Sequence, residues 1–400
     1  MKKTLTTLFM TFAVAFTVLL VSGTTSKALE TWNANITQTD AGEQSVELKW
    51  DAYLGADHYE IFFSTDNNNW VYMDYATGTS TSIYQLTSSS RYYVKLVAYS
   101  GSYYSDSKTP IAESGSVDVI TSPEEVQGLK QTDATTSTIT MSWNNMPGAD
   151  GYMIYRYDSY GNYTNLGSSA KNSFTIKGLQ ASTRAAYFVL AVKLNSAGQS
   201  AYSTPNGFVY MRTAPAKVAY VSMTNFWSYS NSASFGWNSV NNVDGYQFQL
   251  QDYKGKSILT KDTSSTSISA DPFKKGIFTK ARCRAYIVVN NKRIYGAWSG
   301  YDYNASCSNI KVIRSANRKK ITLKWSKIKG ASGYGIYVST KSESGYKKVK
   351  TVKAKTTKYS FTKFKKKALK KNQRYYIRIK YLTKVGKKTV TSGIAGSGSI

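Results

Sequence analysis

Apolar and polar residues alternate along many short stretches of this chain, and the stretches are bounded by residues typical of turns. Segment 321–325 reads Ile-Thr-Leu-Lys-Trp, and segment 374–381 reads Arg-Tyr-Tyr-Ile-Arg-Ile-Lys-Tyr. A period of two predicts half-buried antiparallel strands. Helical periodicity is absent after the first 28 residues. Turn signals recur about every 8–12 residues, which is the spacing expected of a β-sandwich.

The same spacing of aromatic residues, which we call the Trp–Tyr ruler, occurs four times. Four tryptophans are spaced 93, 94 and 88 residues apart, and each is followed nine residues later by a tyrosine that closes a short turn. The pairs are Trp50 and Tyr59, Trp143 and Tyr152, Trp237 and Tyr246, and Trp325 and Tyr334. A period this long predicts copies of one small domain rather than one large core. We expect repeats at 30–121, 122–213, 214–309 and 310–400.

The pattern within a repeat resembles the fibronectin type III domain. A Trp lies in the second predicted strand, a Tyr opens the third, and Leu86 stands six residues before Tyr92 ahead of an alternating strand. Segments 285–299 and 195–203 are similar to hairpins of that family. The resemblance, which is to bacterial secreted proteins built of such domains, implies an all-β chain of four tandem immunoglobulin-like β-sandwiches. No Arg-Gly-Asp occurs, so the cell-attachment loop of animal relatives is not supported.

Two departures from the family pattern bear on stability. The Tyr six residues after the Leu is kept as Tyr92 and Tyr375 but is replaced by Ala185 and Thr279 in repeats two and three. In the family that Tyr ties a loop to its strand through the hydroxyl. We therefore expect repeats two and three to lose stability or to use another tie. Repeat one also carries His58 where the others have Gly.

The first 28 residues predict a secretory signal peptide. Lys2 and Lys3 precede the apolar run 8–21, and Ser26-Lys27-Ala28 supplies small residues for cleavage after Ala28. The alternative is an uncleaved membrane anchor, although the run is shorter than the ~20 residues of a spanning helix. We expect a secreted or extracellular protein, either released or associated with the cell wall, with no membrane span in the mature chain.

Charge is distributed unevenly over the repeats. The whole chain carries +29, whereas residues 30–121 hold 4 basic and 12 acidic residues and residues 310–400 hold 27 basic residues and one acidic residue, Glu343. Such a domain attracts polyanions. The predicted polyanion-binding residues are Lys319, Lys320, Lys324, Lys363, Lys365, Lys366, Lys367, Lys370, Lys371, Arg374, Arg378, Lys380, Lys387 and Lys388. A solvated basic face is the alternative for any Lys run.

The sequence offers little for catalysis. His58 is the only histidine, and we expect it to be a surface residue in a turn between strands. A nucleophilic triad would need that histidine in a suitable motif, and none accompanies it. Asp66-Asn67-Asn68-Asn69 is interpreted as a hairpin turn rather than a calcium loop. We expect no enzyme activity, no cofactor and no metal site.

The two cysteines, Cys283 and Cys307, lie in repeat three. Export would permit a disulfide. A hairpin turning at Asn290-Asn291 would pair Val289 with Lys292 and place Cys283 opposite about Trp298. Cys307 is nine residues further on, out of direct cross-strand reach, so the spacing argues against an internal disulfide.

Three functions fit these features. The first is a non-catalytic binding or adhesion protein whose basic repeat attaches to an anionic cell-wall or matrix polymer. The second is an extracellular binder of nucleic acid, without sequence preference, or of biofilm matrix. The third is an accessory module for carbohydrates, in which loop tyrosines contact glycans; the same tyrosines could instead be cross-strand packing. Contact between the acidic and basic repeats of different molecules, giving filaments, is a further hypothesis.

Overall fold

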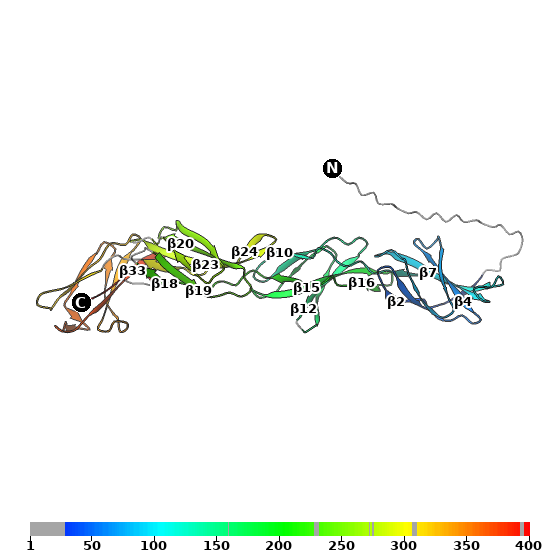
Figure 1. Cartoon of the computed structure of the whole chain (residues 1–400), viewed down its shortest axis with the longest axis horizontal. Coiled ribbons are helices and arrows are strands. Elements are labelled where there is room, and N and C mark those ends of the chain that lie inside the picture. The colour runs from blue at the N-terminus through cyan, green and yellow to red at the C-terminus, as the bar shows by residue number, and fades with distance from the viewer. Residues whose placement is uncertain are drawn as a thin grey trace, which may run out of the picture. The chain divides into compact units, whose positions relative to one another are not determined.

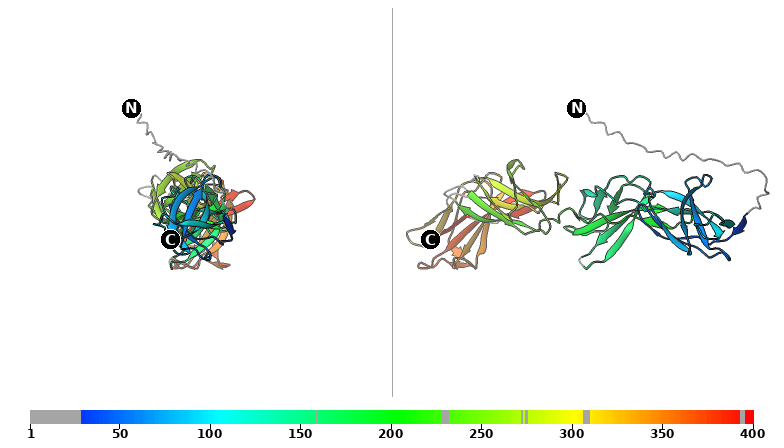
Figure 2. Two further views of the ribbon diagram at one scale, coloured as in Figure 1. Left: turned by 90° about the vertical axis from the view of Figure 1, so that its right-hand side faces the viewer. Right: turned by 45° about the vertical axis from the view of Figure 1, so that its right-hand side comes forward.

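The computed structural model describes residues 29–158, 160–227, 232–271, 273, 276–305, 310–392 and 396–400. The predicted signal peptide and Cys307 lie outside these residues. Every regular element of the described chain is a β-strand, as Figures 1 and 2 show. The described residues contain no helix that could cross a lipid bilayer. The chain is therefore all-β, as the alternating pattern predicted.

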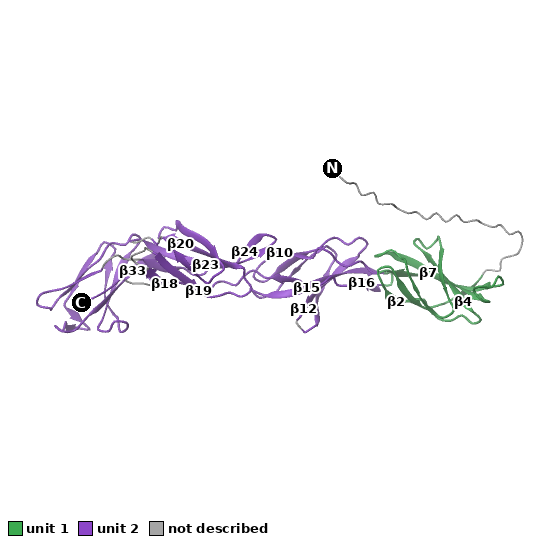
Figure 3. Ribbon diagram, viewed as in Figure 1, with its two compact units in different colours: residues 1–121, 195–197 green, residues 122–194, 198–400 purple. Residues whose placement is uncertain are grey.

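The strands fall into two compact units, which are coloured separately in Figure 3. The first comprises residues up to Thr121 together with Asn195–Ala197, and the second comprises Ser122–Leu194 and Gly198–Ile400. The first unit holds one pair of sheets. The second holds three pairs of the same kind, so the sheet pattern recurs with the period of the Trp–Tyr ruler.

In the first unit, one sheet has the order β1-β8-β7-β4-β5 with β9 also paired to β7, and the other has the order β2-β3-β6. Strand β1 runs parallel to β8, and the other pairs are antiparallel. The strands are β1 (Glu30–Trp32), β2 (Thr37–Ala41), β3 (Val46–Lys49), β4 (His58–Ser64), β5 (Val71–Ala76), β6 (Ser80–Ile83), β7 (Arg91–Ser100), β8 (Thr109–Ser114) and β9 (Val117–Ile120).

In the second unit, the first pair of sheets is β10-β11-β14 and β13-β12-β15-β16, with β17 paired to β15. Its strands are β10 (Lys130–Ala134), β11 (Ile139–Ser142), β12 (Gly151–Tyr157), β13 (Tyr163–Ser169), β14 (Ser173–Ile176), β15 (Arg184–Leu194), β16 (Ser200–Tyr202) and β17 (Val209–Arg212).

The next pair is β18-β19-β22 and β21-β20-β23-β24, with β25 paired to β23. Its strands are β18 (Val221–Trp227), β19 (Ser232–Trp237), β20 (Gly245–Asp252), β21 (Ser257–Thr263), β22 (Ser267–Ala270), β23 (Phe278–Val289), β24 (Lys292–Tyr295) and β25 (Asp302–Ala305). Val289 pairs with Lys292, which confirms the predicted hairpin. Cys283 exchanges hydrogen bonds with Ser299, one residue beyond the predicted partner.

The last pair is β26-β27-β30 and β29-β28-β33-β34, with β35 paired to β33. Its strands are β26 (Lys311–Arg314), β27 (Ile321–Lys324), β28 (Gly333–Ser339), β29 (Lys347–Lys353), β30 (Lys358–Phe361), β33 (Tyr376–Val385), β34 (Lys388–Thr391) and β35 (Gly396–Ser399). The stretch 363–371 contains a small hairpin of β31 (Lys363–Phe364) and β32 (Lys367–Ala368). Lys365 and Lys366 form its turn with φ of 51° and 65°.

Each pair of sheets encloses an apolar cluster that contains its ruler Trp and Tyr. The two rings lie 5.1 to 5.7 Å apart between centroids in every repeat. The Tyr hydroxyl also accepts a backbone N–H from the residue six positions earlier, at 2.9 to 3.0 Å. The bonds are Tyr53 to Tyr59, Met146 to Tyr152, Val240 to Tyr246 and Ile328 to Tyr334. The nine-residue spacing thus packs the Tyr ring against the core Trp and lets the Tyr hydroxyl accept a backbone N–H that would otherwise lack a partner in the fold.

The second tyrosine tie is present where the sequence keeps it. Tyr92 accepts the N–H of Thr87 at 2.9 Å, and Tyr375 accepts that of Lys370 at 3.0 Å. In repeat two, Thr213 bonds to Gln180 O at 2.8 Å. In repeat three, the buried hydroxyl of Thr279 donates to Asn304 O at 3.1 Å. Repeat one makes the equivalent bond from Thr121 to Thr87 O in addition to its tyrosine tie, so the expectation of lower stability or another tie in repeats two and three stays a prediction.

Candidate polyanion-binding surface of the fourth repeat

The fourteen predicted basic residues lie on both sheets of the last repeat and in its turns. Lys324 is on β27, Arg378 and Lys380 are on β33, and Lys388 begins β34. Twelve of the side chains are exposed, and only Arg378 and Lys380 are half-buried. Alternation explains this placement, because Ile321, Leu323, Ile377 and Ile379 occupy the inward positions of the same strands. The surface is basic on more than one side rather than a single compact site.

The three-stranded sheet aligns lysines that lie far apart in sequence. Lys311 of β26 pairs with Lys324 of β27, and Lys324 pairs with Lys358 of β30. All three side chains are exposed. We call these residues the lysine row. Directly opposite side chains on neighbouring strands have Cβ atoms roughly 4.5–5.5 Å apart, so like charges placed this way destabilise a sheet. An anion bound across the row would remove that repulsion.

Sequence reasoning identified Lys324 but missed Lys311 and Lys358. Each is an isolated lysine at a strand end, and nothing local distinguishes it from any solvated lysine. The alternation within each strand could have indicated that Lys311 and Lys358 face outward, because outward positions recur at every second residue. Pairing register, which depends on the whole sheet, was needed to bring them together.

On the other sheet, basic side chains lie close to aromatic rings. Tyr337 of β28 pairs with Arg378 on one side and Lys348 on the other. Lys380 Nζ lies 5.7 Å from the Tyr337 ring centroid, and Arg378 Cζ lies 4.1 Å from that of Tyr346. Arg378 also contacts Glu343 at 3.3 Å. Because Glu343 is the only acidic residue from 310 to 400, carboxylates of this repeat leave nearly all of its positive charge uncompensated.

Arg314 has a structural role within this basic surface. Its guanidinium donates to the carbonyl oxygens of Gln373, at 3.0 Å, and Lys370. It therefore holds the turn that presents Lys370, Lys371 and Arg374. The amide of Lys370 is fixed from the other side by the Tyr375 hydroxyl. These bonds order a loop that carries three like charges.

The single histidine is not the surface turn residue that the sequence predicted. His58 begins β4 and is 1% exposed. Its ring stacks on Tyr99 at 5.0 Å, and Nδ1 donates to the Gly101 carbonyl at 2.9 Å. Nε2 is buried and has no hydrogen-bond partner among the residues that the structure describes. The prediction was wrong because the position opens a strand whose neighbours come from β7 and the following turn.

No cluster of three metal-binding side chains is found among the described residues. Asp66 caps the predicted hairpin turn by accepting the amides of Asn68 and Asn69 at 2.9 and 2.8 Å. Cys283 is a buried free thiol, and burial raises its pKa to about 12. A thiol in this state is a poor nucleophile at neutral pH.

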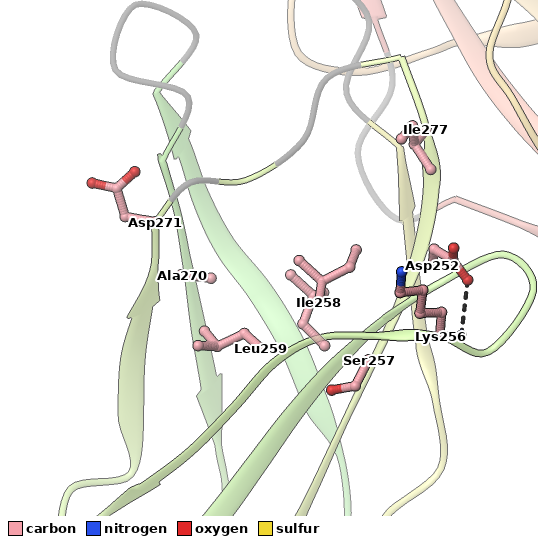
Figure 4. Close-up of a pocket in the computed structure, with 9 residues that line it drawn as sticks. Asp252, Lys256, Ser257, Ile258, Leu259, Ala270, Asp271 and Ile277 are labelled. Carbon is pink, nitrogen blue, oxygen red and sulfur yellow. Dashed lines mark hydrogen bonds between the residues drawn. The ribbon is translucent and has the colours of Figure 1, made fainter.

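A pocket of 310 Å³ in the third repeat also lacks a reactive arrangement. It is lined by Leu250, Ile258, Leu259, Ala270 and Ile277 with a few polar residues. In Figure 4 its two carboxylates, Asp252 and Asp271, lie on opposite sides. Asp252 accepts the backbone N–H of Lys256 at 2.9 Å, the bond drawn dashed in the figure. The carboxylate of Asp252 thus closes a turn.

The tyrosines expected near loops divide between exposed and packed positions. Tyr104 and Tyr160 are 83% and 88% exposed. Tyr157 stacks on Phe208 with centroids 4.2 Å apart, and Tyr103 stacks on Tyr75 at 3.7 Å. Packing between strands therefore occurs for some of these tyrosines, and contact of the exposed ones with glycans stays a prediction.

Comparison with known proteins gives sequence similarity to two curated proteins, and no family model matches the chain. The fibronectin type III domain-containing protein 7 of Mus musculus is 25% identical over 210 residues, which is 52% of this chain and 27% of that protein. Exoglucanase B of Cellulomonas fimi is 30% identical over 151 residues, 36% of this chain and 14% of that protein. The matches thus span about a quarter and a seventh of these relatives, and the second does not show catalysis.

Two solved structures were also matched. The chicken CNTN1 FN1-FN3 domains are 17% identical, with a TM-score of 0.28, over 67% of this chain and 96% of that one. A segment of two fibronectin type III domains from chicken tenascin is 17% identical, with a TM-score of 0.26, over 45% of this chain and 99% of that one. Together, the paired sheets, the recurrent Trp–Tyr core and the sequence matches identify what the chain resembles. It is similar to proteins built of tandem fibronectin type III domains, and its repeats are β-sandwiches of that kind.

Proposed function

We propose that this chain is a secreted, non-catalytic binding protein whose fourth repeat attaches to an anionic polymer of the cell surface, such as a phosphate-bearing wall polymer. The lysine row carries the proposal. Three exposed ammonium groups stand side by side on one sheet of a repeat that has one carboxylate. The other thirteen basic residues predicted from sequence, on both sheets and in the turns of the repeat, add to the long-range attraction. The remaining repeats, the first of which is acidic, act as spacer or adhesive domains.

Binding of this kind has a defined salt dependence. Each phosphate neutralised by a cation releases counterions, so the logarithm of the affinity falls linearly with that of the salt concentration. The test compares the full chain with K311Q/K324Q/K358Q. The control, K130Q/K171Q/K177Q, removes the same charge from exposed lysines of repeat two. Sedimentation with isolated wall material and titration with polyphosphate are measured from low to high salt.

The proposal requires that K311Q/K324Q/K358Q lose affinity and show a shallower salt slope, while the control stays close to wild type. Equal loss in both variants would mean that net charge alone governs binding, and no loss in either would remove the row from the interface. Duplex DNA serves as competitor. If DNA displaces the protein completely from wall material, the nucleic-acid function replaces the one proposed.

A carbohydrate-binding accessory function is the second candidate. It is favoured by the similarity to part of Exoglucanase B and by the aromatic side chains that remain exposed, Tyr104 and Tyr160 among them. Binding to a neutral polysaccharide that is unaffected by salt, and that is lost in Y104A/Y160A, would support it over polyanion attachment.

A further inference from the structure

A second cationic surface lies in the third repeat, on strand β23 (Figure 1). Because side chains alternate along the strand, Ala281, Cys283 and Ala285 face the core. Lys280, Arg282 and Arg284 lie half-buried on the opposite face. The same face of β20 contributes Gln247 and Gln249, which pair in register with Arg284 and Arg282. The strip therefore combines three cations with neutral amide side chains.

Aromatic rings separate these cations. Tyr301 lies 4.6 Å from Lys280 Nζ and 5.3 Å from Arg282 Cζ. The indole of Trp298 lies 4.1 Å from Arg282 Cζ and 4.4 Å from Arg284 Cζ. Because alternate residues of a strand are about 7 Å apart, we place the indole between the two guanidinium groups. Tyr295 follows at 3.6 Å from Arg284 Cζ. We call Lys280, Tyr301, Arg282, Trp298, Arg284 and Tyr295 the cation–ring ladder.

Hydrogen bonds fix the ladder without neutralising it. Arg282 Nε donates to Gln249 Oε1 at 2.8 Å, and Arg284 donates twice to Gln247 Oε1, at 3.1 and 2.7 Å. Neither arginine meets a carboxylate among the described residues. Burial, with a smaller contribution from the charge of Arg282, lowers the pKa of Arg284 against the opposing effects of Tyr295 and Asp262. Most of the five N–H donors of each guanidinium remain for a ligand.

The chemistry of the strip selects among anions. A guanidinium binds carboxylate, phosphate or sulfate in a planar fork. Both arginines lie over the Trp298 ring, so this indole is less accessible for stacking with a nucleic-acid base. What it presents is cationic N–H donors beside amides and phenol hydroxyls, and Tyr301 already bonds Gln251 at 3.1 Å. Such mixed donors and acceptors suit a chain that carries hydroxyl groups as well as charge.

At its Lys280 end the ladder meets a pocket of 160 Å³ within the same unit. The pocket is lined by Tyr253, Lys280, Tyr301 and Tyr303 together with Thr383 and Lys384 of the following repeat. It adds a fourth cation, Lys384, and the rings of Tyr253 and Tyr303 beside Lys280. We propose that the ladder is a binding site for an acidic polysaccharide, with Arg282 and Arg284 holding its carboxylate groups.

The test uses the full chain and oligomers of polygalacturonic acid. The matched ligand control is the same oligomer with its carboxylates reduced to alcohols. Because repeat four also attracts polyanions, binding is read at individual residues, from the NMR signals of the Arg282 and Arg284 Nε–H groups. We expect both signals to shift with the acidic oligomer and to stay unchanged with the reduced one. R282Q/R284Q should weaken binding at this site at least tenfold.

R282K/R284K keeps the charge but loses the planar fork, so we expect an intermediate loss. This variant also keeps the proposal testable if R282Q/R284Q fails to fold. The lysine-row variant K311Q/K324Q/K358Q should leave the two arginine signals responsive, which separates this site from the one in repeat four. Shifts confined to repeat four, or R282Q/R284Q binding as wild type, would overturn the proposal. Tighter binding of single-stranded DNA at the same arginines would also overturn it.

Discussion

At the scale of single residues, one aspartate organises a whole turn. Asp66 Oδ1 accepts the backbone amides of Asn68 and Asn69 and the Ser64 hydroxyl, and Oδ2 accepts the Asn69 side chain at 2.7 Å. Hydrogen bonds from Asn69, Asn68 and Ser64 hold the pKa of Asp66 well below its usual range. Asp158 and Asp252 close the corresponding turns of the next two repeats, whereas in repeat four Ser339, which aligns with Ser64, accepts the amide of Lys341.

The low pKa of Asp66 predicts a pH-dependent contribution to stability. A carboxyl whose folded pKa lies below its unfolded value of about 3.9 stabilises the fold fully above that value. The contribution is lost as pH falls through the folded pKa. We expect D66N to lower the urea midpoint of the first repeat at neutral pH, and the difference from wild type to shrink below about pH 3. A difference that is constant with pH would contradict this, as would an NMR titration of Asp66 at the ordinary aspartate value.

The residues that sequence reasoning misplaced share a physical cause. The turn at Asp66 was predictable because its partners, Ser64, Asn68 and Asn69, lie within three residues of it. His58 was not, since the groups that bury it, Tyr99 and Gly101, come more than forty residues later. Lys311 and Lys358 were missed for the same reason, because only strand pairing makes them neighbours. Local pattern predicted inward and outward positions well, whereas the lysine row depends on register.

At the scale of elements, the strand that carries the ruler Tyr as its second residue shows how closely neighbouring strands approach within a repeat. The residue before that Tyr is His58 in repeat one and Gly151, Gly245 or Gly333 in the others. A Cβ at Gly333 would lie 2.7 Å from the Val352 carbonyl oxygen on the neighbouring strand. At Gly151 the nearest atom would be 3.4 Å away, which is close to ordinary contact.

These distances predict a graded series of alanine variants. G333A should destabilise its repeat by about 1–3 kcal/mol, the usual cost of overpacking, because a backbone carbonyl cannot move aside cheaply. G245A should be intermediate, since the closest atom is the Tyr286 hydroxyl at 2.7 Å, followed by the Thr263 carbonyl at 3.0 Å. G151A should be mildest. Urea unfolding followed by the NMR signals of each repeat measures the three. Equal losses of unfolding free energy in the three variants would show that contacts of the added methyl group do not determine the destabilisation.

At the scale of the whole molecule, the uneven distribution of charge could be predicted from the sequence alone. The first repeat has 12 acidic against 4 basic residues, and the last has 27 basic against one acidic. Some of the acidic side chains of repeat one are engaged locally, as Glu60 is by Lys108 at 2.7 Å. Most of the charge at the two ends is nevertheless exposed to solvent. Opposite charges on different molecules will attract over a distance set by the ionic strength.

We therefore predict that the full chain self-associates at low salt. At 0.01 M ionic strength the screening length is roughly 30 Å, so the basic repeat of one molecule attracts the acidic repeat of another; at 0.15 M it is about 8 Å. Sedimentation equilibrium should give an average mass that rises with protein concentration at low salt and returns to that of the monomer at high salt. K311Q/K324Q/K358Q should weaken the association more than K130Q/K171Q/K177Q does. A monomer mass independent of concentration at low salt would exclude head-to-tail contact, and the uneven charge would then serve binding to other polymers alone.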